Sequence, residues 1–132
     1  MSISLVSSLE ELTQGLMSIP EEIKSIQIQI LDLNEDSQQK STSINRLESV
    51  LKSEINSAVG DDNKKLYPNA EARDAAFVEK SSEHPELCSM KEDYSTIQRK
   101  IQELRIESEM LSNKQRNIRS LLEIISVVGD KK

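Results

Sequence analysis

Apolar residues recur every three or four positions along two long stretches of this chain, and this spacing constrains its fold more than any other feature. The first stretch runs from Leu5 to Leu51 and the second from Leu87 to Ile125. Alternating steps of four and three residues define the a and d positions of a heptad, which bury one stripe of a helix against a partner helix. The pattern predicts an all-α fold: a long antiparallel helical hairpin, or coiled coil, that assembles into a helical bundle.

The heptad spacing and its interruptions predict a single helical-hairpin domain over residues 1–132. We expect a short N-terminal helix or kinked extension over residues 1–18 and a first long helix over residues 19–59. A tip loop with a short helix follows over residues 60–86, and a second long helix over residues 87–128.

Capping signals set these boundaries. Ser18 and Pro20 have the pattern of a helix start, a serine cap followed by a proline in the first turn, so we expect a kink or short break near residues 17–19. Asn69 precedes an alanine-rich run and is a cap candidate for the tip helix. His84, which stands before a proline, marks the start of the last helix.

Polar residues at core positions predict how the two long helices align. The first ladder is interrupted by Ser37 and Lys40, and the second by Ser108 and Gln115. Polar layers in a coiled coil lower its stability and fix its register. If the helices fold back antiparallel, Lys40 lies near Ser108 and Ser37 near Gln115, which groups the polar positions.

Charges beside the two ladders also favour pairing within one chain. The flanking positions of the first helix carry acids (Glu22, Asp36 and Glu48), and those of the last helix carry bases (Lys91, Lys100, Arg105, Lys114 and Arg119). Opposite signs across a seam select the partner helix. Each exposed pair contributes only about 0.2–1 kcal/mol, so these charges choose the partner more than they stabilise it.

Several apolar residues fall outside the seam that an internal hairpin needs. Ile28 and Leu31 lie off the first ladder, and the last helix ends in a broader apolar run that includes Leu121, Ile124 and Val128. The chain has only one Phe, two Tyr and no Trp, so its own core is small and a partner is expected. The main hypothesis is a non-enzymatic coiled-coil scaffold or adaptor that forms a homodimer or binds another protein through helix packing.

Basic residues of the last helix support an alternative, a nucleic-acid-associated accessory protein. They are Arg99, Lys100, Arg105, Lys114, Arg116 and Arg119. The formal net charge of −6 argues against wholesale phosphate binding, and no aromatic residues interleave with the bases to stack on nucleotides. A solvated face that selects a partner helix and a phosphate-binding face both remain open.

The predicted tip carries a third group of candidates. Lys64, Lys65, Tyr67, Asn69 and Arg73 form a mixture suited to an acidic or phosphorylated surface. The simpler interpretation is that Leu66 and Tyr67 close the end of the hairpin while the lysines are solvated. The sequence leaves both interpretations open.

Features of enzymes, metal sites and membrane proteins are not apparent. We find no nucleotide-binding glycine loop and no catalytic constellation, and the chain has one His and one Cys (His84 and Cys88). We therefore expect no catalysis, no cofactor and no metal. The N-terminal run MSISLVSSLEEL lacks a basic region and a long apolar stretch, so we expect a cytoplasmic protein that does not associate with membranes.

One stretch resembles a known group of proteins. The run from Asp62 to Arg73 is similar to a D-x-x-K-x-[YF]-x-N-x-x-x-R segment found between the long helices of small uncharacterised helical-hairpin proteins of bacteria and phages. The resemblance is specific only over this dozen residues. It implies a helical hairpin and a bacterial or phage-related context, and it implies no activity.

Overall fold

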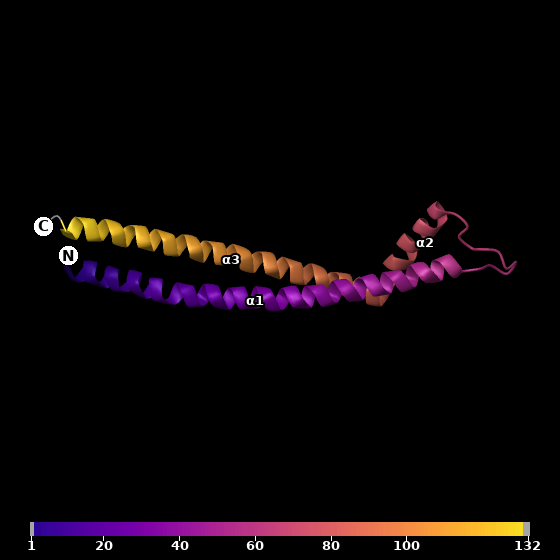
Figure 1. Cartoon of the computed structure of the whole chain (residues 1–132), viewed down its shortest axis with the longest axis horizontal. Coiled ribbons are helices and arrows are strands. Elements are labelled where there is room, and N and C mark those ends of the chain that lie inside the picture. The colour runs from indigo at the N-terminus through magenta and orange to yellow at the C-terminus, as the bar shows by residue number, and fades with distance from the viewer. Residues whose placement is uncertain (1, 131–132) are drawn as a thin grey trace. The chain divides into compact units, whose positions relative to one another are not determined.

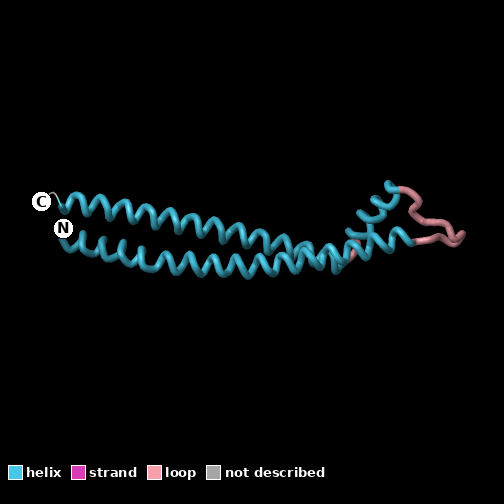
Figure 2. The backbone as a smooth tube through the Cα atoms, in the orientation of Figure 1, coloured by secondary structure: helices cyan, strands magenta, loops and turns pink. Residues whose placement is uncertain are grey.

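The chain folds into long helices that pair as a hairpin. The computed structural model describes residues 2–130, with side chains described over residues 7–128. The helices are α1 (Ser2–Ser57), α2 (Ala70–Ser82) and α3 (Pro85–Asp130) (Figure 1). α1 and α3 pack against each other, and helix accounts for most of the backbone (Figure 2). The predicted all-α helical hairpin is confirmed.

The contacts within the chain define two compact units. Unit 1 consists of Met1–Leu33 and Lys100–Lys132, and unit 2 consists of Asn34–Arg99. Unit 1 therefore contains the first part of α1 and most of α3. Unit 2 contains the rest of α1, all of α2 and the start of α3.

The expected break in the first helix is absent. α1 runs from Ser2 to Ser57 through Pro20, so no separate short helix ends at residue 18; the alternative, a kinked extension with its kink near residues 17–19, stays a prediction. Proline inside a helix removes one backbone hydrogen bond, but the apolar ladder keeps its spacing across it and buries Ile19 to 2% exposure. Ser18 does not cap a helix, because its hydroxyl instead donates to the carbonyl of Gly15 at 3.5 Å.

The core of unit 1 is a single aliphatic seam between two helices. α1 contributes the buried residues Ile19 and Ile26, and α3 contributes Ile101, Leu104 and Ile118. The helices come close at Gly15, where an added Cβ atom would lie 3.0 Å from the Ile118 Cδ1 atom. Other seam residues are only half-buried (Leu9, Leu12, Leu16, Ile23 and Ile30). Two helices alone therefore cover this seam incompletely.

The core of unit 2 draws on three helices. Buried Ile44, Leu51, Ile55, Ala76 and Leu87 form one cluster, around which half-buried side chains pack (Leu47, Tyr67, Phe77, Met90 and Tyr94). α2 packs against the last turns of α1, because the Lys52 Nζ atom lies 4.9 Å from the centre of the Phe77 ring. The aromatic residues of the chain are thus concentrated in this unit.

The predicted alignment of the polar core positions is wrong. The Lys40 Nζ atom lies 3.9 Å from Asp93 Oδ2, not near Ser108. Ser37 accepts a hydrogen bond from Gln98 Nε2 and does not lie near Gln115. In each case the partner lies about two heptads earlier in α3 than predicted.

The tip explains this shift in register. α2 occupies the side of the last turns of α1, so α3 meets α1 further from the end of that helix. The predicted preference for opposite charges is confirmed at one pair, where Lys91 Nζ lies 3.8 Å from Glu48 Oε2. The sequence indicated the correct partner helix but not the correct alignment.

Candidate interaction surfaces

The tip is held together by most of the residues that were candidates for recognition. Asn69 caps α2 as predicted, since its Oδ1 atom accepts a hydrogen bond from the Ala72 amide at 2.8 Å. Arg73 is half-buried, and its Nη1 atom donates to the Tyr67 carbonyl at 3.4 Å. The Lys80 Nζ atom lies 5.6 Å from the centre of the Tyr67 ring. Tyr67, Asn69 and Arg73 therefore have structural partners within the tip.

The two tip lysines belong to a short ordered turn. The Gly60 amide donates to the Lys64 carbonyl at 2.9 Å, and the Leu66 amide donates to the Ala58 carbonyl at 2.9 Å. Within the turn Asn63 adopts a φ of 60°, a conformation that asparagine tolerates better than most residues. The side chains of Lys64 and Lys65 are exposed, while the Arg73 guanidinium bonds within the tip. The three cations therefore differ in their surroundings: the two lysines are exposed, and the half-buried arginine bonds to the backbone.

The start of α3 has the cap that the sequence indicated. The His84 Nδ1 atom accepts a hydrogen bond from the Leu87 amide at 3.1 Å, which uses the imidazole as a helix cap. Cys88 is a free, half-buried thiol whose Sγ atom lies 3.5 Å from the Ser81 carbonyl. Over the described part of the chain, no three His, Cys, Asp or Glu side chains come together in a way that could hold a metal ion.

The basic residues of α3 are exposed, and acidic residues lie on the same stretch of the helix. All six candidates (Arg99, Lys100, Arg105, Lys114, Arg116 and Arg119) lie on the surface. Glu103, Glu107 and Glu109 are also exposed on the same stretch of helix. Acids placed between the bases reduce the local positive potential that phosphate binding requires.

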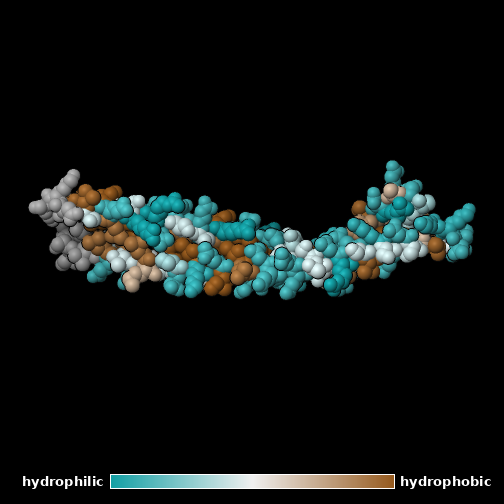
Figure 3. Space-filling model, viewed as in Figure 1, coloured by the Kyte–Doolittle hydropathy of each residue, from teal (hydrophilic) through white to brown (hydrophobic). Residues whose placement is uncertain are grey.

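The apolar candidates are exposed in unit 1. Ile28 and Leu31 of α1 are 50% and 60% exposed. Those of α3 are similar, at 49% for Leu121, 59% for Ile124 and 61% for Val128. Hydrophobic side chains gather on the surface of this part of the molecule (Figure 3). A folded chain leaves such residues in water at a cost, so clusters of them mark interaction surfaces.

Other exposed apolar residues were not predicted as interaction candidates. In unit 1 they include Met17, Ile106 and Met110, all more than half exposed, and unit 2 exposes Val50, Val59, Leu66 and Val78. Met17, Ile106 and Met110 lie off the a and d positions, as Ile28 does, so the heptad pattern already indicated them. Val127, which belongs to the broad apolar run at the end of α3, is also more than half exposed.

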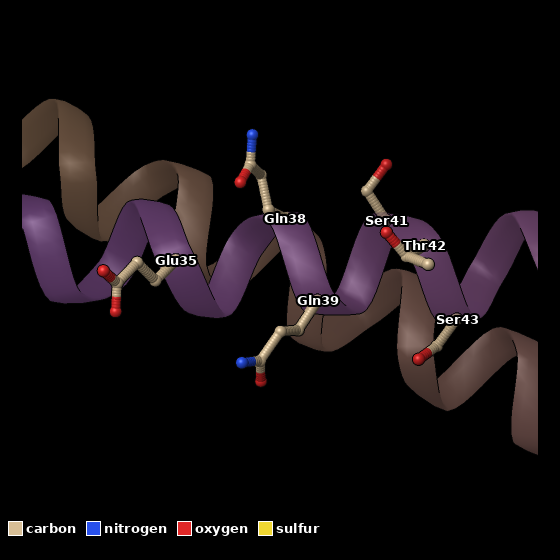
Figure 4. A pocket seen from close by; sticks show the side chains of 6 residues that line it. All are labelled: Glu35, Gln38, Gln39, Ser41, Thr42 and Ser43. Atoms are coloured by element: carbon tan, nitrogen blue, oxygen red, sulfur yellow. The ribbon is translucent and has the colours of Figure 1, made fainter.

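One surface hollow of unit 2 follows α1. It is lined by Glu35, Gln38, Gln39, Ser41, Thr42 and Ser43, which lie on consecutive turns of this helix. These side chains point away from the helix in different directions and do not converge on a common point (Figure 4). A binding pocket needs a few polar groups that converge, so this hollow is an ordinary helix surface.

The geometry defines the chain as an all-α helical hairpin with exposed apolar side chains on its two-helix unit. Within the described residues, no helix has the length and apolar character needed to cross a membrane. The chain matches no protein-family model, no curated protein and no solved structure. The resemblance of the tip segment to bacterial and phage helical-hairpin proteins therefore stays a prediction.

Proposed function

We propose that this protein is a non-enzymatic scaffold or adaptor that binds protein helices on the exposed apolar surface of unit 1. Helices of a second copy or of another protein pack against Ile28 and Leu31 of α1 and against the apolar end of α3. The mode of binding is helix packing as in a helical bundle. The proposed setting is the cytoplasm, without a cofactor.

The exposure of apolar side chains on both helices of unit 1 supports this proposal most directly. Ile28, Leu31, Leu121, Ile124 and Val128 are all about half exposed or more, although they lie on long ordered helices. Burying the exposed half of one such side chain stabilises a complex by roughly 0.8–1.5 kcal/mol.

Affinity capture with matched variants tests the proposed function. The purified chain is immobilised and exposed to a cell extract, and bound proteins are compared between wild type, Ile28→Glu and a surface control, Gln39→Glu. Gln39 is an exposed residue of α1 in unit 2, so the control adds the same charge away from the apolar surface. We expect specific partners that wild type and the control retain and that Ile28→Glu loses.

Salt separates this function from nucleic-acid binding. Helix packing through apolar residues is nearly insensitive to salt between about 50 and 200 mM, whereas phosphate contacts weaken by orders of magnitude over that range. Steep salt dependence, together with insensitivity to Ile28→Glu, would favour the nucleic-acid alternative through the basic residues of α3. A monomeric chain that captures no Ile28-dependent partner would overturn the proposed function.

A further inference from the structure

The chain exposes more surface than a compact folded protein of its mass, which leaves ample area for contact with a partner. The chain exposes 10058 Å², whereas a compact folded monomer of 14.9 kDa exposes about 7000 Å². The excess of about 3000 Å² is larger than the roughly 800 Å² per partner that a standard protein interface buries. Apolar side chains are exposed on both helices of unit 1, so burying them against a partner would stabilise the folded chain.

On α1, exposed apolar residues form a second heptad stripe outside the seam. Its positions are Met17, Glu21, Lys24, Ile28 and Leu31, which are separated by alternating steps of four and three residues. Every one of them is exposed. The apolar residues occupy the first, fourth and fifth positions of this α1 stripe, and opposite charges occupy the second and third.

On α3, a second stripe has the same arrangement. Its positions are Met110, Lys114, Asn117, Leu121 and Ile124, with the same steps of four and three residues and all exposed. Apolar residues again occupy the first, fourth and fifth positions of this α3 stripe. The second position is the base Lys114 in the α3 stripe and the acid Glu21 in the α1 stripe.

From this match we propose that the α1 stripe of one copy packs against the α3 stripe of a second copy, with the two helices parallel. The inference names the partner for the proposed function and depends on it. In this alignment Met17 faces Met110, Ile28 faces Leu121 and Leu31 faces Ile124.

The polar positions select the parallel direction. Parallel pairing sets Glu21 against Lys114 and Lys24 against Asn117. The antiparallel alignment that opposes Met17 to Leu121 and Ile28 to Met110 instead sets Lys24 against Lys114. Like charges directly opposed disfavour that arrangement, whereas the acid and base of the parallel alignment attract.

The two stripes lie on opposite sides of the hairpin, which determines the kind of assembly. The α1 stripe occupies heptad positions b and f, and the α3 stripe occupies c and g. In an antiparallel helix pair, the b positions of both helices share one side and the c positions share the other. The contact is therefore between unlike surfaces, and each copy offers one surface of each kind. Such heterologous contacts add copies until a ring closes or the assembly stays open.

Complementation between two variants tests this contact. The first variant, Ile28→Glu with Leu31→Glu, loses the α1 stripe and keeps the α3 stripe. The second, Leu121→Glu with Ile124→Glu, loses the α3 stripe and keeps the α1 stripe. A control, Gln38→Glu with Gln39→Glu, adds the same charge to exposed positions of α1 in unit 2. Circular dichroism of all full-length chains verifies that the helices are intact.

Light scattering over a range of concentrations gives the outcome. We expect wild type and the control to exceed twice 14.9 kDa, and each stripe variant alone to stay at 14.9 kDa. An equimolar mixture of the two stripe variants should restore one intact contact and form a 1:1 dimer. Association of either variant alone, or a mixture that stays monomeric while wild type associates, would overturn the proposal.

A charge exchange tests the direction and alignment of the two stripes. Glu21→Lys or Lys114→Glu alone should weaken association about two- to five-fold, and the double exchange should restore it. No recovery in the double variant contradicts the parallel alignment. Wild type that remains monomeric at every concentration overturns this inference, while an Ile28-dependent partner in the capture experiment would still support the proposed function.

Discussion

Units 1 and 2 share the same two long helices, yet they bury their side chains differently. In unit 2, α2 joins α1 and α3, and one cluster buries Leu87 completely. Ion pairs, a buried Ser37 that bonds to Gln98, and two helix caps add polar contacts with defined partners. In unit 1, two helices meet through a narrow aliphatic seam, and many apolar side chains remain in water.

The two units differ in how far they cover their apolar side chains. A third helix gives unit 2 a buried cluster with half-buried aromatic side chains around it, although Val50, Val59, Leu66 and Val78 remain exposed. Unit 1 has only two helices, which can bury one stripe each. The remaining apolar stripes of unit 1 stay exposed. They are the surface on which we propose that a partner helix packs, whereas Tyr67, Asn69 and Arg73 at the tip make contacts within the chain.

The largest predicted loss of stability comes from creating a cavity in the core of unit 2. Leu87→Ala removes a fully buried side chain and should lower the free energy of unfolding by about 2–5 kcal/mol. Leu111→Ala removes a half-buried seam residue of unit 1 and should cost clearly less. Urea denaturation followed by circular dichroism measures both, with the exposed Val78→Ala as a neutral control. Equal costs for Leu87→Ala and Leu111→Ala would mean that the two units are equally well packed.

The sequence predicted the architecture because the heptad spacing extends over most of the chain. It also predicted both helix caps, Asn69 and His84, since capping depends on a few neighbouring residues. Of the two alternatives predicted near residues 17–19, the short break is absent, because apolar packing along the whole helix outweighs a local helix-breaking signal; the kink stays a prediction. Propensity is a weak guide wherever tertiary packing opposes it.

The alignment of the helices could not be predicted, because it depends on how the tip packs. Lys40 pairs with Asp93 only because α2 takes up the last turns of α1, and the heptad pattern contains no information about that placement. The apolar candidates Ile28 and Leu31 were identifiable from their off-seam positions, and their exposure agrees with the prediction. Whether they bind a partner stays a prediction.

Removing the N-terminal cap of α2 tests whether the stability of unit 2 depends on this helix. Asn69→Ala removes the acceptor for the Ala72 amide and should cost about 1 kcal/mol, within a range of roughly 0.5–2 kcal/mol. Asn69→Asp keeps an acceptor and should retain most of the stability. Urea denaturation gives the magnitude, and hydrogen exchange should show faster exchange in α2 than in unit 1. Equal losses in the two variants would argue against a capping role.

The ion pair between Glu48 and Lys91 also tests how the two units differ, through a smaller coupling energy. Its side chains are 24% and 49% exposed, so solvent screens their attraction. A double-mutant cycle with Glu48→Gln and Lys91→Met should give a coupling of about 0.2–1 kcal/mol that decreases with added salt. The same cycle with Glu22 and Lys114, two exposed residues of unit 1 between which no ion pair is described, serves as the comparison. A larger coupling in unit 1 would contradict the view that polar specificity is concentrated in unit 2.

The smallest effect on the stability of the isolated chain is expected for Ile28→Glu. This substitution distinguishes stability that comes from within the hairpin from stability that comes from association. Ile28 is 50% exposed and off the seam, so Ile28→Glu should change the stability of the dilute chain by no more than about 0.5 kcal/mol. Association stabilises the folded state by mass action, so the thermal midpoint of wild type should rise with protein concentration. Ile28→Glu should remove most of that rise while preserving helicity. Melting curves followed by circular dichroism across a hundredfold concentration range measure both quantities. A large loss of stability at the lowest concentration would place Ile28 within the hairpin core, and unit 1 would then resemble unit 2 in using its apolar residues internally.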